Sequence, residues 1–415
     1  MIDGDFMDRQ MMLDLDANDR LKKFRDKFYI PHDTLYFDGN SLGMAPLETK
    51  RKMIEVIEKE WGQGLIRSWA DEDWAISGQR VGNKIAKLIG ANEGEVIAAD
   101  STSINIFKAI AAALQCNTGR KIVLSTDDNF PTDLYMMQGL EKFSPERIKG
   151  MTVKSDQILD SLNEEVAAIL LTEVNYKTGQ ILDMSKITKK AHEKGILVIW
   201  DLSHSAGSIP VHLNKYSVDF AVGCGYKFLN GGPGAPAFIF ISKKHQKNIY
   251  PIRSGWMGHK DPFEFSKNYT AANGIDRFLC GTPPLLGLIA LECGVDLVLE
   301  ADLKQLRKKA IKLSVIFIEL MERQCNKYGF KLASPKNKNN RAGHVSFRHA
   351  NGFSVSRALA ADGVIGDFRV PDIIRFGIAP IYTRYQDIYD AVERIKHVMK
   401  LEKWKQFDQK VTSYT

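Results

Sequence analysis

Two residues that follow consecutive apolar runs, Asp201 and Lys227, have the side chains needed for chemistry on a bound cofactor. The run 195–200 leads into Asp201, and the run 218–222 leads into a Gly-Cys-Gly turn and then Tyr226-Lys227. If both runs are neighbouring strands, they bring acid and amine to the sheet edge where open α/β folds bind ligands. An amine can form a Schiff base, and an acid can keep a pyridinium nitrogen protonated. The pair therefore indicates pyridoxal 5'-phosphate (PLP) as cofactor.

Two other stretches are expected to present polar or aromatic side chains near this edge. Ser101-Thr102-Ser103 precedes an amphipathic run, where hydroxyl side chains first of all cap a helix. The same arrangement leaves backbone N–H groups that suit a phosphate, so both interpretations stay open. Phe130-Pro-Thr-Asp133 follows the short apolar run 121–124, which predicts a ring and a carboxylate at the strand end.

Strands and helices are expected to alternate from about residue 95 to 241, which indicates an α/β fold with a mostly parallel, doubly covered sheet. The predicted strands are 121–124, 165–171, 195–200, 218–222 and 237–241, with helices at 77–89 and 184–194. No GxGxxG follows the first strand, so the pattern argues against a nicotinamide-binding version of this fold.

The remaining stretches predict a second, smaller α+β domain and an N-terminal segment. Apolar spacing predicts a helix over 302–326, and Leu306, Leu313, Phe317 and Leu320 should face its core. Further predictions are strands at 343–348 and 373–378, helices at 385–400, 14–28 and 47–61, and a solvated loop at 336–341. We divide the chain into residues 1–62, packing with the small domain, a large PLP-binding domain at 63–290 and the small domain at 291–415.

Composition places the chain among globular proteins rather than membrane or nucleic-acid-binding ones. Of its 415 residues 44% are hydrophobic and 26% charged, and no apolar run reaches the length of a bilayer span. The net charge of +7 is spread along the chain without a basic helix. The acidic N-terminus lacks a signal-peptide core, and the five cysteines are scattered, so we expect a cytoplasmic protein with reduced thiols. No HExxH or Cys/His cluster suggests a metal.

Several motifs in one order resemble kynureninase, a fold-type I PLP enzyme of the aspartate aminotransferase-like kind, related to aminotransferase class V. The resemblance covers most of the chain. Its blocks are Phe37–Gly43, Phe130–Asp133, Asp201–Gly207, Tyr226–Pro236, Gly255–Pro262, Gly281–Pro284 and Arg375–Pro380. Members hydrolyse L-kynurenine, or its 3-hydroxy form, to an anthranilate and L-alanine. The resemblance therefore implies a hydrolase of the kynurenine pathway, in tryptophan catabolism or in pyridine nucleotide (NAD) biosynthesis.

The resemblance also implies roles around the cofactor ring. Lys227 would form the Schiff base and then carry the α-proton of the substrate, and Asp201 would pair with the pyridinium nitrogen. Phe130 would stack on the ring, with Asp133 hydrogen-bonding nearby. His204 would lie beside the ring or its 3-hydroxyl, and a purely structural turn histidine is the alternative.

Further roles implied by the family concern the phosphate and the reacting carbonyl. Thr102 and Ser103 would hold the phosphate at a helix N-terminus, and Thr172 would line the pocket. Tyr226 would reach the phosphate and act as general acid or base near the substrate carbonyl; an ordinary core tyrosine is the alternative.

Four of the residues implied by the family concern substrate and assembly. Arg375 would bind the α-carboxylate by a bidentate pair, with Ser41 also contacting substrate. Trp256 and Thr282 would reach the phosphate from a neighbouring subunit, which implies a homodimer with shared active sites. Animal-type members carry Asn in place of Thr282, so this chain leans towards unmodified L-kynurenine.

Two other functions fit parts of the sequence. A cysteine desulfurase or selenocysteine lyase shares the fold and needs a reactive thiol, for which Cys280 lies in the right region. Thiol alkylation would abolish that activity and spare kynurenine cleavage. A catalytically silent ligand-binding scaffold is the other alternative, against which the intact Lys227–Asp201 pair argues.

Overall fold

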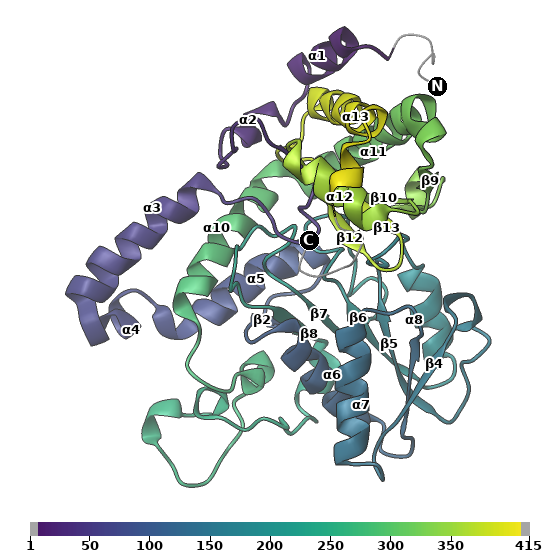
Figure 1. Ribbon diagram of the computed structural model, residues 1–415. Coiled ribbons are helices and arrows are strands. Elements are labelled where there is room, and N and C mark those ends of the chain that lie inside the picture. The colour runs from purple at the N-terminus through teal and green to yellow at the C-terminus, as the bar shows by residue number, and fades with distance from the viewer. Residues whose placement is uncertain (1–6, 408–415) are drawn as a thin grey trace.

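The computed structural model describes residues 7–407 and contains a large mixed sheet flanked by helices, with a smaller domain beside it (Figure 1). The large sheet has the strand order β2-β8-β7-β6-β5-β3-β4. Its strands are β2 Val96–Ala98, β3 Ile122–Thr126, β4 Lys149–Val153, β5 Val166–Thr172, β6 Leu197–Asp201, β7 Phe220–Gly223 and β8 Phe238–Ile241. β8 pairs antiparallel with β2 and β7, and the other neighbours pair parallel. The predicted α/β fold with a mostly parallel sheet is confirmed.

Helices cover both faces of this sheet, which explains why its strands read as continuous apolar runs. Every residue of β5 is buried. Alternation sends Ile199 towards α6 Thr102–Cys116 and α7 Pro131–Phe143, whereas Val198 and Trp200 face the core shared with the other helices. Those helices are α5 Ser77–Ile89, α8 Met184–His192 and α10 Leu285–Ala301. The predicted helix 77–89 is confirmed, whereas β2, β4 and α10 are elements that sequence reasoning missed.

Asp219, immediately before β7, joins the amino ends of the two strands that carry the predicted acid and amine. Its fully buried carboxylate accepts a hydrogen bond from the backbone N–H of Val198 in β6, at 2.9 Å. His192 and His245 lie 2.8 Å from the same carboxylate, and Lys244 lies 2.6 Å from it. These partners come from α8 and from α9 Lys243–Gln246, so one carboxylate fixes two strands and two helices together.

The smaller domain packs three helices on one antiparallel sheet. Its strand order is β12-β13-β10-β9, with β9 Lys331–Leu332, β10 His344–Arg348, β12 Asp367–Arg369 and β13 Ile373–Gly377. The helices are α11 Leu303–Cys325, α12 Gly352–Ala361 and α13 Tyr385–Lys400. Phe317 of α11 lies against Phe376 of β13 with ring centroids 5.0 Å apart. The expected strands and the helices near 302–326 and 385–400 are confirmed.

The N-terminal segment differs from the prediction. The expected helix 14–28 is wrong, because the chain forms α1 Arg9–Ala17 and α2 Lys22–Arg25 with a break between them. In the break the Asn18 side chain donates to the carbonyl of Asp14 and Asp19 accepts from the N–H of Leu21, and such local side-chain bonds compete with helix continuation. The predicted helix 47–61 is likewise two elements: α3 Leu47–Glu55 continues as a π-helix, Val56–Gly64.

The domain division at residue 290 falls inside the continuous helix α10, and the turn at Asp302 between α10 and α11 is the natural place to separate the helices. The N-terminal segment packs on both domains. Met12 and Phe37 belong to the small-domain core, whereas Phe24 belongs to the core under the large sheet. β1 Leu35–Tyr36 also pairs with β11 Val364–Ile365. The three-part division of the chain therefore stays a proposal.

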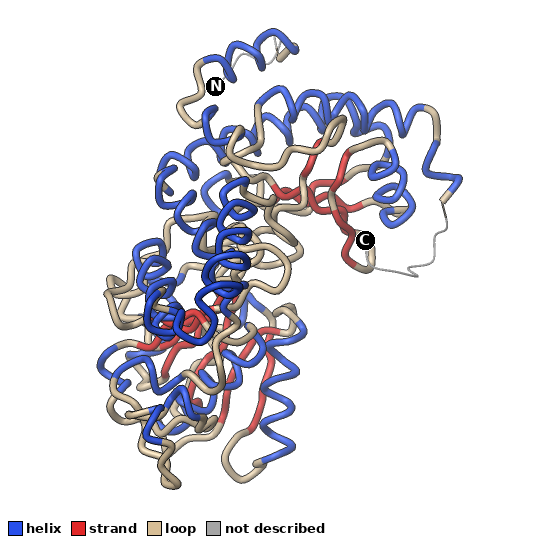
Figure 2. The backbone as a smooth tube through the Cα atoms, turned by 90° about the vertical axis from the view of Figure 1, so that its left-hand side faces the viewer, coloured by secondary structure: helices blue, strands red, loops and turns tan. Residues whose placement is uncertain are grey.

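The loop 336–341 is solvated as predicted except at its end. Residues 336–340 are exposed, but Arg341 is buried, donates to Ser314 Oγ at 3.1 Å and also bonds the Pro335 carbonyl. Within residues 7–407 no helix has the length and apolarity to span a membrane. The acidic stretch at residues 1–5, used above to argue against a signal peptide, lies outside the described residues. Figure 2 shows the small domain set to one side of the large sheet.

Candidate active site

A cavity of about 150 Å³ lies where β5 and β6 end, and both Asp201 and Lys227 line it. β6 and β7 are parallel neighbours with Asp201 opposite Val222, so the two strand ends deliver acid and amine to one space. Eight residues singled out in the sequence line this cavity: Thr102, Ser103, Phe130, Thr172, Asp201, His204, Tyr226 and Lys227. Asp133, Ser41, Trp256, Thr282 and Arg375 lie outside its lining.

The Lys227 side chain is surrounded by rings. Its Nζ lies 5.8 Å from the centroid of Phe130 and 5.7 Å from that of Tyr226, and it is 3.5 Å from His204 Nε2. Only 9% of Lys227 is exposed, although no carboxylate forms an ion pair with its ammonium among the described residues. A buried amine with aromatic walls and a neutral neighbour is placed to react with a carbonyl rather than to fix the fold.

His204 is the neutral neighbour. Burial lowers its pKa well below the ordinary value, and the positive charge of Lys227 and the proximity of His344 act in the same direction. The two histidine rings lie 5.6 Å apart. His344, on β10, is fully buried with both ring nitrogens unpartnered among the described residues, and burial lowers its pKa to about 3. Sequence reasoning missed His344, because a histidine within a predicted strand carries no signal that it faces another domain.

Two carboxyl groups lie at the base of the site. Ser203 donates its backbone N–H to Asp201 Oδ1 at 2.7 Å, and Thr172 Oγ1 donates to Asp133 Oδ2 at 3.3 Å. Burial raises the pKa of Asp133 well above the ordinary value, and the charge of Asp201 adds to the rise. Burial also raises the pKa of Asp201, opposed by Ser203 and by the charge of Lys227. A positively charged group bound beside Asp133 and Asp201 would therefore lower their pKa values and favour the ionised carboxylates.

The cavity has the features that PLP requires. The 15-residue helix α6 starts at its rim, where Ser101 caps the first turn and Thr102 and Ser103 add hydroxyls, a suitable site for a phosphate. Ser103 Oγ lies 3.4 Å from Thr132 Oγ1 of α7. Asp133 Oδ1 is buried without a hydrogen-bond partner in the described residues, which is costly unless a ligand satisfies it. The donors, acids and amine present thus fit the cofactor.

Arg375 lies behind the cavity in a dense polar cluster. Its Nε donates to Asp367 Oδ1 at 2.7 Å and its Nη2 donates to Asp367 Oδ2, so the expected bidentate partner position is taken by a protein carboxylate. Ser41 Oγ accepts from Arg375 at 2.9 Å, which brings these two predicted substrate contacts together. Burial and the charge of Asp367 raise the pKa of nearby Asp38 to about 8.

The irregular segment 254–284 carries the residues expected to act across a subunit boundary. It contains short 3₁₀ turns, one of them Trp256–Gly258, and extends away from the sheet at the lower left of Figure 1. Trp256, Phe263 and Phe265 form an exposed aromatic cluster, with ring centroids 5.8 and 6.5 Å from Trp256. Thr282 is exposed as well, and Cys280 does not line the cavity.

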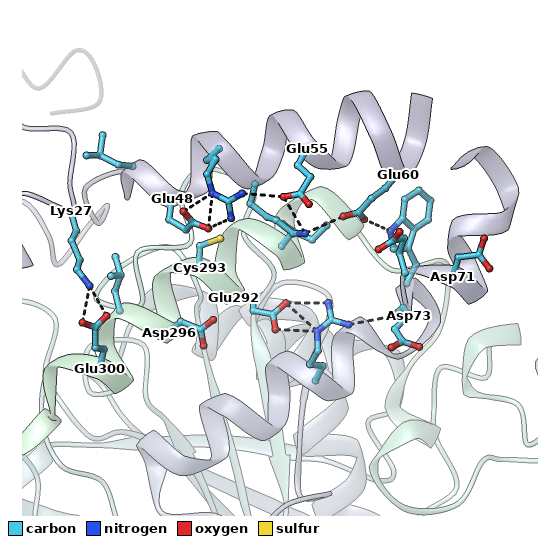
Figure 3. Close-up of a pocket in the computed structure, with 18 of the residues that line it drawn as sticks. Lys27, Glu48, Glu55, Glu60, Asp71, Asp73, Glu292, Cys293, Asp296 and Glu300 are labelled. Atoms are coloured by element: carbon cyan, nitrogen blue, oxygen red, sulfur yellow. Dashed lines mark hydrogen bonds and ion pairs between the residues drawn. The ribbon is translucent and has the colours of Figure 1, made fainter. Parts of the chain in front are cut away.

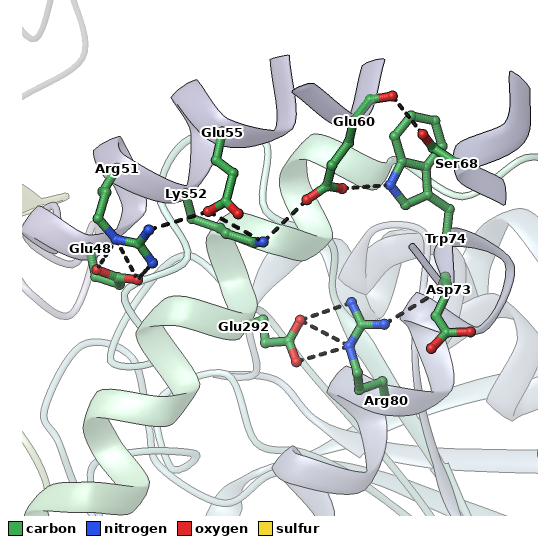
Figure 4. A network of polar contacts seen from close by, with 10 residues as sticks. All are labelled: Glu48, Arg51, Lys52, Glu55, Glu60, Ser68, Asp73, Trp74, Arg80 and Glu292. Carbon is green, nitrogen blue, oxygen red and sulfur yellow. Dashed lines mark hydrogen bonds and ion pairs between the residues drawn. The ribbon is translucent and has the colours of Figure 1, made fainter. Parts of the chain in front are cut away.

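A larger cavity, about 980 Å³, lies between α3, α5 and α10 (Figure 3). Its acidic side chains are largely neutralised by neighbours. Glu292 pairs with Arg80 at 3.0 Å, and Glu60 accepts from Trp74 Nε1 at 2.8 Å and pairs with Lys52 at 3.2 Å (Figure 4). These contacts join helices to one another, so they account for the acidic residues structurally. Size alone does not make this space the reaction site.

Glu173, next to Thr172, predicts a measurable pH dependence of stability. It is buried, and burial raises its pKa from 4.5 to about 7. Folded Glu173 therefore keeps its proton over a pH range where the unfolded residue has lost it. The unfolding free energy should fall as pH rises from about 4.5 to about 7, by on the order of 3 kcal/mol.

Glu173→Gln removes this contribution because the amide stays neutral. Its stability relative to the unchanged chain should therefore increase between pH 5 and pH 8, as measured by urea unfolding. The exposed Glu164→Gln is the matched control. Parallel pH profiles for Glu173→Gln and the unchanged chain would contradict a neutral Glu173.

Two solved structures show that this fold is shared with other enzymes. An apo cysteine desulfurase from Thermococcus onnurineus NA1 matches with a TM-score of 0.78 at 18% identity, covering 91% of this chain and 98% of that one. A C-DES mutant with glycine covalently linked to its PLP cofactor matches with a TM-score of 0.75 at 17% identity, covering 90% and 98%. At such identities the likeness establishes the fold alone.

Sequence relatives are much closer. A kynureninase from Pseudomonas fluorescens is 42% identical over 403 residues, covering 96% of this chain and 97% of the relative. One from Deinococcus radiodurans is 45% identical over 390 residues, covering 93% and 95%. The family model for the kynureninase C-terminal domain also matches residues 306–395. With relatives this similar over nearly its full length, the chain belongs to the kynureninase family.

Proposed function

We propose that this protein is a PLP-dependent kynureninase, which hydrolyses the Cβ–Cγ bond of L-kynurenine, or of its 3-hydroxy form, to give anthranilate or 3-hydroxyanthranilate and L-alanine. Family membership supports the reaction, and one observation supports the site: Lys227 and Asp201 line one cavity with the ring of Phe130 and the hydroxyls of α6. The overall reaction consumes one water. The protein acts in the kynurenine pathway.

In this proposal the residues that hold the cofactor are those described above in and around the cavity. Lys227 would bind its aldehyde carbon, Asp201 would pair with its ring nitrogen, and Phe130 would lie against its ring. Thr102 and Ser103, which line the cavity at the start of α6, would take the phosphate. Asp133 lies outside the lining but contacts the lining residue Thr172, and its unpartnered Oδ1 would accept a hydrogen bond there. Bound in this way, PLP withdraws electrons from the α- and β-carbons of the attached amino acid.

The protein's own residues then position the substrate and move protons. The Lys227 amine would take the α-proton of the bound substrate, for which its position 3.5 Å from neutral His204 is suitable. Asp201 keeps the ring nitrogen protonated, which favours loss of that proton. Water adds to the γ-carbonyl, and the Cβ–Cγ bond breaks as anthranilate leaves.

Tyr226 supplies the final proton to the β-carbon, directly or through an ordered water. Burial raises the pKa of its phenol, so the group holds its proton at neutral pH and serves as an acid. Its ring is 37% exposed and borders the cavity, which leaves room for a substrate beside it.

The active unit in this proposal is a cytoplasmic homodimer with shared sites. The aromatic cluster around Trp256 and the exposed Thr282 support it, since both belong to a segment that extends away from the sheet, and neither Trp256 nor Thr282 lines the cavity of its own chain. In the dimer, Trp256 and Thr282 would complete the phosphate site of the partner subunit. A desulfurase is not favoured, because Cys280 lies outside the cavity lining.

The test is a fluorescence assay of the purified protein loaded with PLP. L-kynurenine should release fluorescent anthranilate together with an equal amount of L-alanine, and 3-hydroxykynurenine serves as the second substrate. Release of neither aromatic product would overturn the proposal. Persulfide formed from cysteine under the same conditions would instead support the desulfurase.

A further inference from the structure

The N–H groups of Arg375 are nearly all used inside the protein. Nε and Nη2 both donate to Asp367, Nη2 also donates to Ser41 Oγ, and Nη1 donates to the carbonyl of Tyr176. An arginine has five N–H groups, so these four contacts leave one for a ligand. Arg375 is 2% exposed and Asp367 is 1% exposed. By itself Arg375 cannot offer the two parallel bonds of a bidentate carboxylate site.

A second arginine stands beside it for a reason visible in the sheet register. Asp367 is opposite Arg375 across the β12–β13 pair, and Arg369 is two residues further along β12. Side chains two apart on a strand share a face, so Asp367, Arg369 and Arg375 point the same way. Phe368, between them in sequence, points to the other side and packs against Phe353 with centroids 5.6 Å apart.

Arg369 differs from Arg375 in being accessible. Its Nη2 lies 2.7 Å from Asp367 Oδ2 and 3.3 Å from Ser41 Oγ, and its Nη1 donates to the carbonyl of Phe368 at 2.7 Å. Its side chain is 31% exposed. These contacts orient the guanidinium while leaving Nε–H and one Nη1–H for a ligand.

The charge of Arg369 reaches the reaction site. Burial raises the pKa of Tyr226, and the positive charge of Arg369 opposes that rise. Burial also lowers the pKa of His204, with Lys227, His344, Arg375 and Arg369 adding to the effect. The cluster adjoins the cavity through Tyr176, whose carbonyl accepts from Arg375 and whose ring lies 5.2 Å from that of the lining residue Phe130. Asp367 pairs with both guanidinium groups, and the raised pKa of nearby Asp38, about 8, keeps that carboxyl neutral at pH 7. The two arginines therefore leave an excess of positive charge for an anion.

We infer that Arg369 is a substrate-binding residue, supplying with Arg375 the donors that hold the α-carboxylate of the amino-acid substrate. Asp367 and Ser41 position the two guanidinium groups. This inference rests on the proposed function, since it names the residue that selects amino acids among the ketones that fit the cavity.

The test compares two ligands that differ in the carboxylate. L-alanine, the proposed product, has it; 2-aminoacetophenone, an aryl ketone fragment, lacks it. Each is used as an inhibitor of kynurenine hydrolysis by the PLP-loaded enzyme. In Arg369→Gln, KM for L-kynurenine and the inhibition constant of L-alanine should rise about 10-fold to 100-fold, the scale of a lost charge-assisted bond. kcat should change much less, and inhibition by 2-aminoacetophenone should not change.

Two further variants serve as controls for this comparison. Arg348→Gln removes a charge from the same sheet, where exposed Arg348 pairs with half-buried Asp372 at 2.8 Å, and should leave all three constants unchanged. Arg369→Lys keeps the charge without the planar fork and should restore part of the L-alanine affinity; it also replaces Arg369→Gln should that protein not fold. Unchanged L-alanine affinity, or equal weakening of both ligands, would overturn the inference. Hydrolysis by the unchanged enzyme tests the proposed function separately.

Discussion

Replacing Lys227 with alanine should abolish kynurenine hydrolysis, lowering kcat by at least about 10⁴-fold, the scale seen when a covalent catalytic group is removed. The side chain has no ion pair among the described residues, so its loss removes little that holds the fold together. The thermal midpoint should therefore stay close to that of the unchanged protein. The measurement is anthranilate release, with circular dichroism to follow unfolding.

Charge and Schiff-base formation can be separated at this position. Lys227→Arg keeps a cation in the cavity but cannot form the linkage, so it should be as inactive as Lys227→Ala. Borohydride reduction of the loaded protein should fix the cofactor to the peptide containing Lys227 in the unchanged enzyme and in neither variant, as read by mass spectrometry. Retained turnover in Lys227→Ala, or cofactor fixed to a different lysine, would contradict the assigned role.

Asp201→Asn should lower kcat for kynurenine by about 10²-fold to 10³-fold, the cost of removing one electrostatic partner in an enclosed site. The amide keeps the shape of the side chain and can still accept from the N–H of Ser203. It cannot keep a pyridinium nitrogen protonated, so the electron-withdrawing strength of the cofactor falls. Steady-state kinetics on the PLP-loaded variant measure the loss.

Without PLP, Asp201→Asn should be as stable as the unchanged protein. Burial opposes the charged form of Asp201, whereas a neutral amide avoids the penalty of burying a charge in the apo fold. Urea unfolding of apo Asp201→Asn should match the unchanged apo protein, whereas the gain in stability on adding PLP should be smaller. A kcat equal to that of the unchanged enzyme would show that Asp201 does not serve the ring nitrogen.

Local pattern was enough to predict the framework of the site. Runs such as 195–200 and 218–222 are apolar throughout because helices cover both sheet faces, and this makes buried parallel strands recognisable without a partner. The residues directly after such strands, Asp201 and Tyr226-Lys227, then meet at one edge for geometric reasons. Amphipathic spacing likewise predicted α5, α11 and α13, whose apolar faces form the cores.

Local pattern failed where side-chain hydrogen bonds, either short-range or long-range, decide the outcome. The break at Asn18 and Asp19 depends on short-range side-chain bonds that compete with an amphipathic pattern continuing to Phe28. The burial of Arg341 depends on Ser314 of α11.

What the sequence alone determined is the fold class, the sheet edge and the chemical types gathered there, because these follow from periodicities within a few residues. Tertiary structure decided the partners. Ser41 and Arg375 are 334 positions apart yet 2.9 Å from each other, and Asp367 occupies the donors that Arg375 was expected to offer the substrate. The first contact depends on how the N-terminal segment packs on the small domain, and the second on the register of β12 against β13. Neither follows from a local periodicity of the sequence.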